Sequence, residues 1–361
     1  MKATQQLHDL GQSLWLDNIT RGLLDSGTLA RYIGELAVTG LTSNPTIFDQ
    51  AIRAGGFYDV AIQQKAGNGL SDEALFFELA LEDLNRAAAL FLPIHQATSG
   101  TDGWVSLEVS PLLAHDTAGT VKTAVALHRQ AHCPNLFIKI PGTRAGLGAI
   151  EEAIYAGVPV NVTLLFSCEQ YLAAAEAYLR GIERRIAAGL DPRIESVASV
   201  FVSRWDVAVK DKVAASLQNR LGIAIAQRTY KAYRELLAAP HWQKLAQSGA
   251  ARQRLLWAST GVKDPAARDT MYLEALAAPD TVNTIPEKTL LAFADHGKVG
   301  GVMPLDGGDA ETLLAEFARS GIDQAALADQ LQHEGAQAFE KSWHELINCI
   351  HSKRATLATA V

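Results

Sequence analysis

The segment 135–142, NLFIKIPG, places a lysine in the middle of an apolar run. A short apolar run that ends at Pro-Gly is typical of a buried strand in a parallel sheet. Lysine is rarely buried, because removing an ammonium group from water is costly, and burial therefore favours the neutral amine. A neutral amine attacks carbonyl compounds and forms a Schiff base with them. Lys139 is therefore the first candidate catalytic residue.

Seven further apolar segments resemble the one around Lys139, at 13–18, 39–45, 103–111, 158–167, 196–204, 254–261 and 280–287. Amphipathic helical stretches separate most of them, such as 167–189, where Ser167 is expected to cap the helix and Gly189 to follow its last turn. Strands that alternate with helices predict βα units around a parallel sheet. Eight such units predict a (β/α)8 TIM barrel, which needs about 250 residues. A doubly wound open sheet is the second possibility.

The chain has 361 residues, more than a barrel needs, and we expect one barrel domain over 1–361 with additional helices. The surplus falls in 46–95, in 205–250 and in a tail from about 309. In the tail, Phe339, Trp343, Leu346 and Ile350 recur at helical spacing. This periodicity predicts a C-terminal helical extension, 309–361, packed on the barrel.

Alternation along each strand predicts which side chains share the barrel interior. If the aliphatic positions face the surrounding helices, then Leu164, Leu256 and Ala258 point outward and Trp257 points inward. The eighth segment is too irregular for an assignment. The polar or ionisable groups expected inside are Asp17, Asn44, Glu108, Lys139, Asn161, Thr163, Ser199 and Ser259. So many converging polar groups could hardly all find hydrogen-bond partners if they served packing alone. Most of them also lie near strand carboxyl ends, where barrel enzymes build their sites.

A Schiff-base reaction needs an acid and a base near the lysine, and Asp17 and Glu108 are the available carboxyl groups. The alternative is that Lys139 and Glu108 form only a structural ion pair. Phe201, inward beside Ser199, either restricts stray proton donors or is a core aromatic residue. No histidine cluster or carboxylate pair has metal-ligand spacing, so we predict neither a metal nor a cofactor.

Two cations follow neighbouring strands and suggest an anion site. Arg204 follows the sixth strand directly, and Lys263 follows the seventh, which also carries Ser259. Cations and hydroxyls at adjacent strand ends can hold a phosphate group through charge-assisted hydrogen bonds. Each cation alone could equally be a solvated loop residue, but together they favour phosphate recognition.

The bulk composition excludes several other classes of function. The formal net charge is −7, without a run of five Lys or Arg, which argues against a nucleic-acid partner and a polybasic membrane anchor. We find no signal-peptide core and no apolar stretch that could span a bilayer. The three cysteines, Cys133, Cys168 and Cys349, form no C-x-x-C pair and fit a reducing compartment. The expected localisation is cytoplasmic, and monomer and homodimer both remain open.

At these residues the sequence resembles the transaldolase family, particularly its longer-chain members. The resemblance covers nearly the whole chain and is carried by GLTSNPTIF (40–48), WVSLEVSP (104–111), IKIPGT (138–143), VNVTLLFS (160–167), SVFVSRWD (199–206) and WASTGVKDP (257–265). It implies transfer of a dihydroxyacetone unit between sugar phosphates in the non-oxidative pentose phosphate pathway. The implied donors are sedoheptulose 7-phosphate or fructose 6-phosphate, and the implied acceptors are glyceraldehyde 3-phosphate or erythrose 4-phosphate.

The resemblance also implies roles for individual residues. The Schiff-base lysine is Lys139, the acid/base aspartate is Asp17, and Glu108 works through a water held by Thr163. Hydrogen bonds to the triose are implied for Asn44 and Ser199, and Asn161 and Phe201 complete the expected substrate site. Arg204 and Ser259 match phosphate-binding positions, whereas a second family arginine is replaced by the offset Lys263. A fructose-6-phosphate aldolase-type lyase and an inactive sugar-phosphate-binding barrel are the alternative functions.

Overall fold

A computed structural model describes residues 1–66 and 69–358 of the chain. Its eight strands are all parallel and run in the order β2-β1-β8-β7-β6-β5-β4-β3. They are β1 (Ser13–Asp17), β2 (Val38–Thr42), β3 (Val105–Glu108), β4 (Leu136–Pro141), β5 (Val160–Leu165), β6 (Ser196–Phe201), β7 (Gln253–Ala258) and β8 (Thr281–Ile285).

Backbone hydrogen bonds close the ring between β2 and the chain that enters β3. Leu41 N donates to Trp104 O at 2.9 Å, and Gly103 N donates to Thr39 O at 3.0 Å. The predicted (β/α)8 barrel is therefore confirmed, and the alternative of an open doubly wound sheet is wrong.

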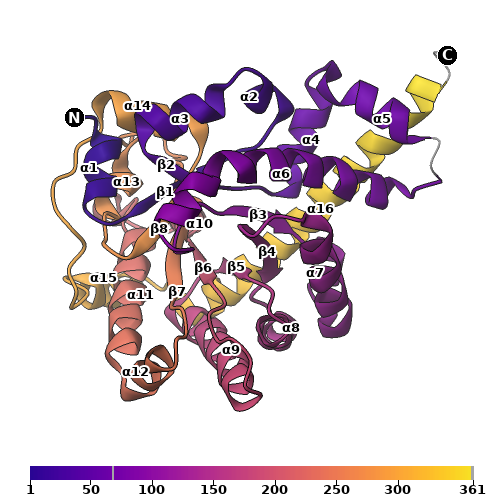
Figure 1. Ribbon diagram of the computed structural model, residues 1–361. Helices are drawn as coiled ribbons and strands as arrows, with labels where there is room; N and C mark the ends of the chain where they lie inside the picture. The colour runs from indigo at the N-terminus through magenta and orange to yellow at the C-terminus, as the bar shows by residue number, and fades with distance from the viewer. Residues whose placement is uncertain (67–68, 359–361) are drawn as a thin grey trace.

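Helices surround the strands and fill the predicted insertions (Figure 1). The α-helices are α1 (Ala3–Asp9), α2 (Arg21–Asp25), α3 (Thr28–Leu36), α4 (Pro45–Arg53), α5 (Asp59–Ala66), α6 (Asp72–Ala97), α7 (Thr117–Ala131), α8 (Arg144–Tyr155), α9 (Cys168–Ala187), α10 (Ser203–Val209), α11 (Leu221–Ala238), α12 (Pro240–Gln247), α13 (Met271–Ala275), α14 (Glu287–His296), α15 (Ala310–Arg319) and α16 (Gln324–Ala358). Short 3-10 helices are η1 (Gly56–Tyr58), η2 (Pro111–Leu113) and η3 (Ala215–Leu217).

The last helix, α16, runs past the ends of the strands and contacts α4, α5, α6 and β5 (Figure 1, yellow). Gln332 on α16 donates through Nε2 to the carbonyl oxygens of Gly142 and Leu164, at 3.1 and 2.9 Å. These bonds tie the helix to the loops that follow β4 and to β5 itself.

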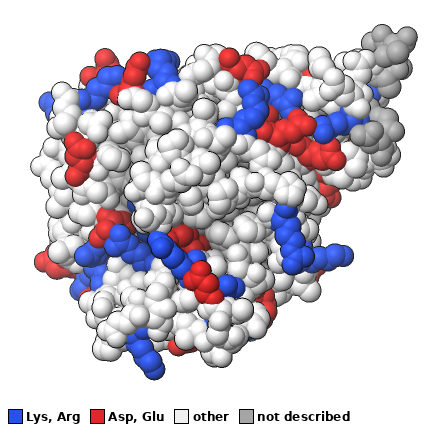
Figure 2. All heavy atoms as spheres, in the orientation of Figure 1, with Lys and Arg blue, Asp and Glu red and all other residues white. Residues whose placement is uncertain are grey.

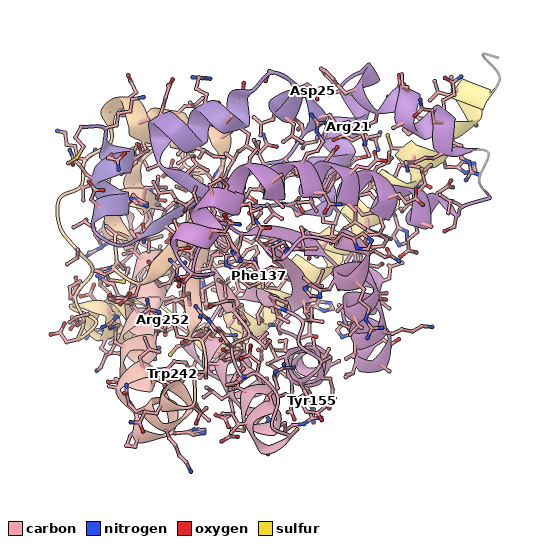
Figure 3. All side chains as sticks on the ribbon, in the orientation of Figure 1. Arg21, Asp25, Phe137, Tyr155, Trp242 and Arg252 are labelled. Atoms are coloured by element: carbon pink, nitrogen blue, oxygen red, sulfur yellow. The ribbon has the colours of Figure 1, made fainter. Side chains whose placement is uncertain are left out.

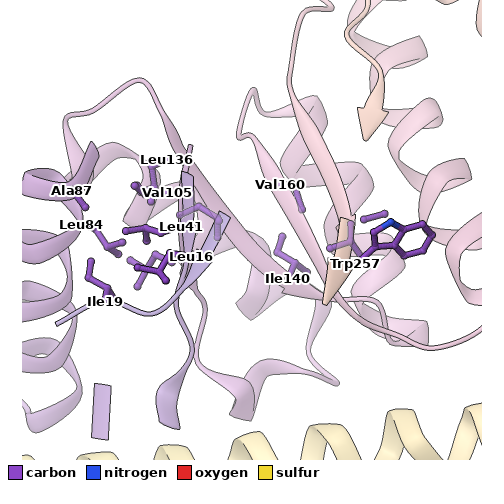
Figure 4. Packing of buried hydrophobic residues seen from close by; sticks show 14 of the residues in the cluster. Leu16, Ile19, Leu41, Leu84, Ala87, Val105, Leu136, Ile140, Val160 and Trp257 are labelled. Atoms are coloured by element: carbon purple, nitrogen blue, oxygen red, sulfur yellow. The ribbon is translucent and has the colours of Figure 1, made fainter. Parts of the chain in front are cut away.

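The buried apolar residues form two clusters. The outer cluster lies between the strands and the surrounding helices, and the inner cluster fills the barrel and continues among α10, α11, α15 and α16. The outer cluster joins the strands to the helices, as Leu16, Leu41 and Leu136 do with Leu84 and Ala87 of α6 (Figure 4). The inner cluster contains Trp15, Trp104, Phe137, Val197 and Val282. Trp104 and Phe137 stack with their ring centroids 4.0 Å apart, and Phe137 lies in the middle of the molecule in Figure 3. Packed aromatic rings thus fill the barrel beneath the strand carboxyl ends.

The expected side-chain directions are wrong at four positions, three in β7 and one in β5. Trp257 belongs to the outer cluster (Figure 4), whereas Leu256 and Ala258 belong to the inner one. From Leu255 to Ala258 both sides of β7 are apolar, so alternation there carried no information. Leu164 also lies in the inner cluster and Leu165 in the outer one, because Leu164 has φ +59° and the register shifts along β5.

The face of the molecule in Figure 2 carries basic and acidic side chains interspersed, with wide uncharged areas between them. Within the described part of the chain, no helix is both long and apolar enough to cross a membrane.

The close approach of β2 to the chain that enters β3 requires a glycine at position 40, and this requirement can be tested. A Cβ added at Gly40 of β2 would lie 2.7 Å from Trp104 O and 2.7 Å from Trp15 Nε1. We expect Gly40→Ala to lower the free energy of unfolding by about 2 kcal/mol, because the strands must move apart. Urea unfolding measures this change.

The matched control is Gly34→Ala in α3, where an added Cβ meets no atom within 4 Å. It should raise the free energy of unfolding by about 0.5–1 kcal/mol, as expected for glycine in a helix. Equal effects of the two substitutions would contradict this account of barrel closure.

Candidate active site

A cavity of about 140 Å³ opens at the carboxyl ends of the strands. It is lined by Asp17, Thr42, Asn44, Lys139, Thr163, Ser199, Phe201, Arg204, Ala258, Ser259, Gly261, Lys263, Thr284, Pro286 and Phe339. Most of the predicted site residues therefore line one cavity. The other two, Glu108 and Asn161, are buried and contact the lining residues Lys139 and Ser199.

Lys139 and Glu108 form a buried ion pair beneath the cavity. The β3–β4 register places the two residues side by side, and the Lys139 Nζ lies 3.4 Å from Glu108 Oε2. The same Nζ donates to the Ser43 carbonyl oxygen at 3.0 Å. Their side chains are only 7% and 3% exposed. The amine is thus held in place by two oxygen atoms at the bottom of the cavity.

Burial raises the pKa of both carboxyl groups near this lysine. For Glu108 the dominant cause is desolvation, which the positive charge of Lys139 opposes and the negative charge of Asp17 reinforces. Desolvation also raises the pKa of Asp17, against the opposing effects of Lys139, the Thr42 hydrogen bond and Lys263. A carboxyl group with a raised pKa holds a proton nearer to neutral pH and can act as an acid or a base.

A hydrogen-bonded chain crosses the barrel behind the cavity. Ser199 Oγ donates to Asn161 Oδ1 at 2.7 Å, and Asn161 Nδ2 donates to Ser106 Oγ at 3.2 Å. Asn161 therefore orients Ser199 and does not line the cavity itself. The Thr163 hydroxyl makes no hydrogen bond, and Glu108 has only its ion pair, among the residues that the structure describes. These buried oxygens remain available to a ligand or a water.

Asn44 has two tasks, because it both caps a helix and lines the cavity. Its Oδ1 accepts a hydrogen bond from Ile47 N at 3.1 Å, which starts α4, and Pro45 occupies the first helical position. With Oδ1 used by the cap, the Nδ2 group is left as a donor for the cavity.

Arg204, Lys263 and Ser259 all line the cavity. The Arg204 Cζ lies 5.2 Å from the centroid of the Phe201 ring, and burial lowers the pKa of its guanidinium group. Neither cation has a hydrogen bond or ion pair within residues 1–66 and 69–358. Ser259 has φ +56°, and its Oγ lies 2.9 Å from Ser203 Oγ. Two unpaired cations beside two hydroxyls are suited to bind an anion, as the sequence predicts.

The described residues contain no group of three or more His, Cys, Asp or Glu placed to hold a metal ion. A larger groove of about 810 Å³ lies on the outer surface between α6 and α7, remote from the lysine.

Sequence reasoning missed several contributors to this site. Thr284 lines it from β8, the strand that received no assignment, although Val282 and Thr284 do alternate inward. Phe339 reaches the mouth from α16, where helical spacing alone could not say what the residue faces. Ser43 contributes a backbone carbonyl, which side-chain patterns do not reveal.

The geometry is that of a barrel enzyme whose cavity holds a buried lysine, two carboxyl groups and two unpaired cations. This set is suited to imine chemistry on a phosphorylated carbonyl compound. Comparison with known proteins agrees with this class. The family model described as "Transaldolase/Fructose-6-phosphate aldolase" matches residues 14–350.

Curated relatives cover almost the whole chain. A protein from Arthrobacter sp. (strain FB24) named "Transaldolase" is 43% identical over 99% of both chains. One from Thermobifida fusca with the same name is 44% identical over 97% of this chain and 98% of its own. "Transaldolase 2" of Nostoc punctiforme is 39% identical over 98% of both chains. The chain belongs to the transaldolase/fructose-6-phosphate aldolase family.

The two unpaired cations, Arg204 and Lys263, lead to a prediction that does not depend on catalysis. We expect Arg204→Ala to weaken the binding of inorganic phosphate about tenfold to a hundredfold, because one charge-assisted contact contributes about 1.5–3 kcal/mol. Titration followed by ³¹P NMR measures the dissociation constant. Arg31→Ala, at an exposed arginine on α3, is the control and should leave it unchanged. Equal phosphate binding by Arg204→Ala and the unmodified protein would contradict the assignment.

Proposed function

We propose that the chain is a transaldolase that moves a dihydroxyacetone unit from a ketose phosphate to an aldose phosphate through an imine on Lys139. The observation that carries this proposal is the Lys139 amine, buried at the bottom of the cavity within 3.4 Å of the Glu108 carboxylate. The family membership and the unpaired cations that line the cavity support it.

The first half of the reaction builds and then cleaves the imine. The Lys139 Nζ attacks the C2 carbonyl of the ketose phosphate, and the resulting carbinolamine loses water. Glu108 and Thr163, whose buried side-chain oxygens have no hydrogen-bond partner among the described residues, bind that water and transfer protons to and from it. Asp17 then takes the proton of the C4 hydroxyl, and the C3–C4 bond breaks. Its electron pair moves to the imine, which becomes an enamine, and the aldose phosphate leaves.

The second half runs these steps in reverse with a different aldehyde. The enamine carbon attacks the acceptor, and the proton on Asp17 passes to the new hydroxyl group. Water then hydrolyses the imine and releases the product ketose. Transfer requires that the enamine is not protonated while it waits, so stray proton donors must be kept out. Phe201 and Phe339 are apolar walls of the cavity and suit this task.

Substrate binding uses the remaining polar groups of the cavity. Asn44 Nδ2 and the Ser199 hydroxyl bind the hydroxyl groups of the triose, and Asn161 holds Ser199 in place. Arg204, Ser259 and Lys263 bind the phosphate group. Lysine offers a point charge, whereas arginine offers a planar fork, so Arg204 supplies most of the directional contact. The protein acts on small sugar phosphates without a metal or organic cofactor.

Borohydride trapping tests the imine directly. With fructose 6-phosphate and sodium borohydride, we expect a triose-sized mass increase on Lys139, because reduction makes the imine permanent. Tandem mass spectrometry of the digested protein locates the label. Lys139→Ala should be unlabelled and inactive, while Lys122→Ala, at a lysine on the remote groove of α7, should behave like the unmodified protein. Labelling of Lys139→Ala at another residue, with activity retained, would refute the proposal.

Product analysis separates transfer from simple cleavage by a fructose-6-phosphate aldolase. A transaldolase given fructose 6-phosphate alone should stop after about one turnover, because the triose stays on Lys139. Addition of an acceptor aldehyde should start multiple turnovers. Continuous release of free dihydroxyacetone without an acceptor would identify a lyase, and no label on Lys139 would identify an inactive barrel.

A further inference from the structure

Asp17 stands at the end of β1 between two threonines from the neighbouring strands. Thr42 of β2 is its direct partner in the β1–β2 register, and Thr284 of β8 pairs with Trp15 two residues earlier. Thr42 Oγ1 donates to Asp17 Oδ1 at 2.8 Å. Thr42 Oγ1 also lies 2.5 Å from Thr284 Oγ1. The three side chains therefore form one continuous chain across the cavity floor.

The number of hydroxyl protons decides which group donates in each of these two hydrogen bonds. A hydroxyl group has one proton to donate, and Thr42 gives its proton to the Asp17 carboxylate. In its contact with Thr284, Thr42 must then accept, so Thr284 is the donor. We propose that Thr284 is a positioning residue that donates to Thr42, which donates to Asp17 Oδ1, and that this leaves Oδ2 as the oxygen that takes the substrate proton. This inference rests on the proposed function of Asp17 as the base of carbon–carbon cleavage.

The chain distinguishes two carboxylate oxygens that are otherwise equivalent. While Asp17 is ionised, Thr42 donates to Oδ1 and must accept from Thr284, so Oδ1 is occupied by a hydrogen bond. Oδ2 is then the oxygen left free to take the proton of the substrate. Buried hydrogen bonds in series polarise one another, so the Thr284 bond strengthens the Thr42 bond to Asp17. The two bonds thereby restrict rotation of the Asp17 carboxyl group.

Thr284 is itself held rigidly by its backbone. Thr260 Oγ1 donates to the Thr284 carbonyl oxygen at 3.0 Å and lies equally close to Asn283 Oδ1. Both strands that carry the threonines flank β1 in the closed barrel. Such a rigid support keeps the Asp17 carboxylate aligned with the substrate hydroxyl group during the reaction.

The threonines supply no proton to the reaction. In cleavage, the C4 hydroxyl proton moves to Oδ2, the C3–C4 electron pair moves to the imine, and Thr42 and Thr284 keep their protons. In the reverse step the Oδ2 proton returns to the acceptor oxygen. Removal of Thr284 is therefore expected to slow cleavage, while imine formation on Lys139 continues.

Thr284→Val is the first test, since it removes the hydroxyl at nearly constant volume. We expect kcat for transfer to fall about tenfold, with KM changed less than threefold and borohydride labelling of Lys139 retained. Thr284→Ser keeps the hydroxyl and should restore at least half of kcat. Thr229→Val, at a fully buried threonine in α11, is the matched control for a lost buried hydroxyl and should leave kcat unchanged.

The pH profile gives a second readout. Asp17 acts as a base only when ionised, so activity is present above its pKa and lost as the pH falls through it. Because burial raises this pKa, the acid limb should lie above the ordinary aspartate value of about 3.9. Thr42→Val removes a hydrogen bond that lowers the pKa, so the limb should move to higher pH. Thr284→Val should move it in the same direction by less.

Titration of the Asp17 carboxyl carbon by ¹³C NMR repeats this measurement without turnover, and so separates this inference from the proposed function. An unshifted Asp17 titration and an unchanged kcat in Thr284→Val would overturn the inference, even if Lys139 is labelled as expected. Loss of Lys139 labelling in Thr284→Val without rescue by Thr284→Ser would also overturn it, because the role would then be structural. Absence of labelling in the unmodified protein would instead overturn the proposed function.

Discussion

The buried ion pair between Lys139 and Glu108 is the interaction on which the site depends. Two charges taken out of water lose solvation energy that their attraction restores only when the geometry is good and other polar groups assist. Here adjacent strands hold the pair in register, and the Ser43 carbonyl oxygen accepts a further hydrogen bond from the amine. Asp17 adds a second carboxyl group, so one cation faces two acids. Desolvation raises the pKa of both, which suits them to exchange protons with a substrate.

The rest of the fold keeps this pair dry and fixed in place. Beneath it, Trp15, Trp104 and Phe137 fill the barrel, and Gly40 lets the ring close against Trp104 and Trp15. Above it, the inserted helices supply parts that the eight βα units lack. Asn44 starts α4 with one amide atom and offers the other to the cavity, while Phe339 of α16 forms part of the mouth. The additional helices therefore contribute to the site as well as to its cover.

Much of this site could be predicted from the sequence because alternation is clear where a strand has one apolar side. In β1, β3 and β4 the aliphatic residues lie outside, and Asp17, Glu108 and Lys139 lie inside, as expected. In β6, Ala198 and Val200 lie outside and Ser199 lies inside, although Val197 also points inward. Alternation failed at Trp257, where both sides of the strand are apolar, and at Leu164, where a left-handed residue reverses the side. Alternation gave no assignment for Thr284, because the eighth segment is irregular. Backbone geometry and long-range helix packing, which fix Ser43 and Phe339, leave no periodic signature.

The central claim is that Lys139, and no other lysine, captures the ketose covalently beside Glu108. A crystal structure of the protein soaked with fructose 6-phosphate and cooled before an acceptor is added tests it most directly. The account predicts unbroken electron density from the Lys139 Nζ to the second carbon of a three-carbon unit, with Asp17 facing its open end. An intact sugar phosphate separated from that nitrogen, or density joined to a different lysine, would contradict it.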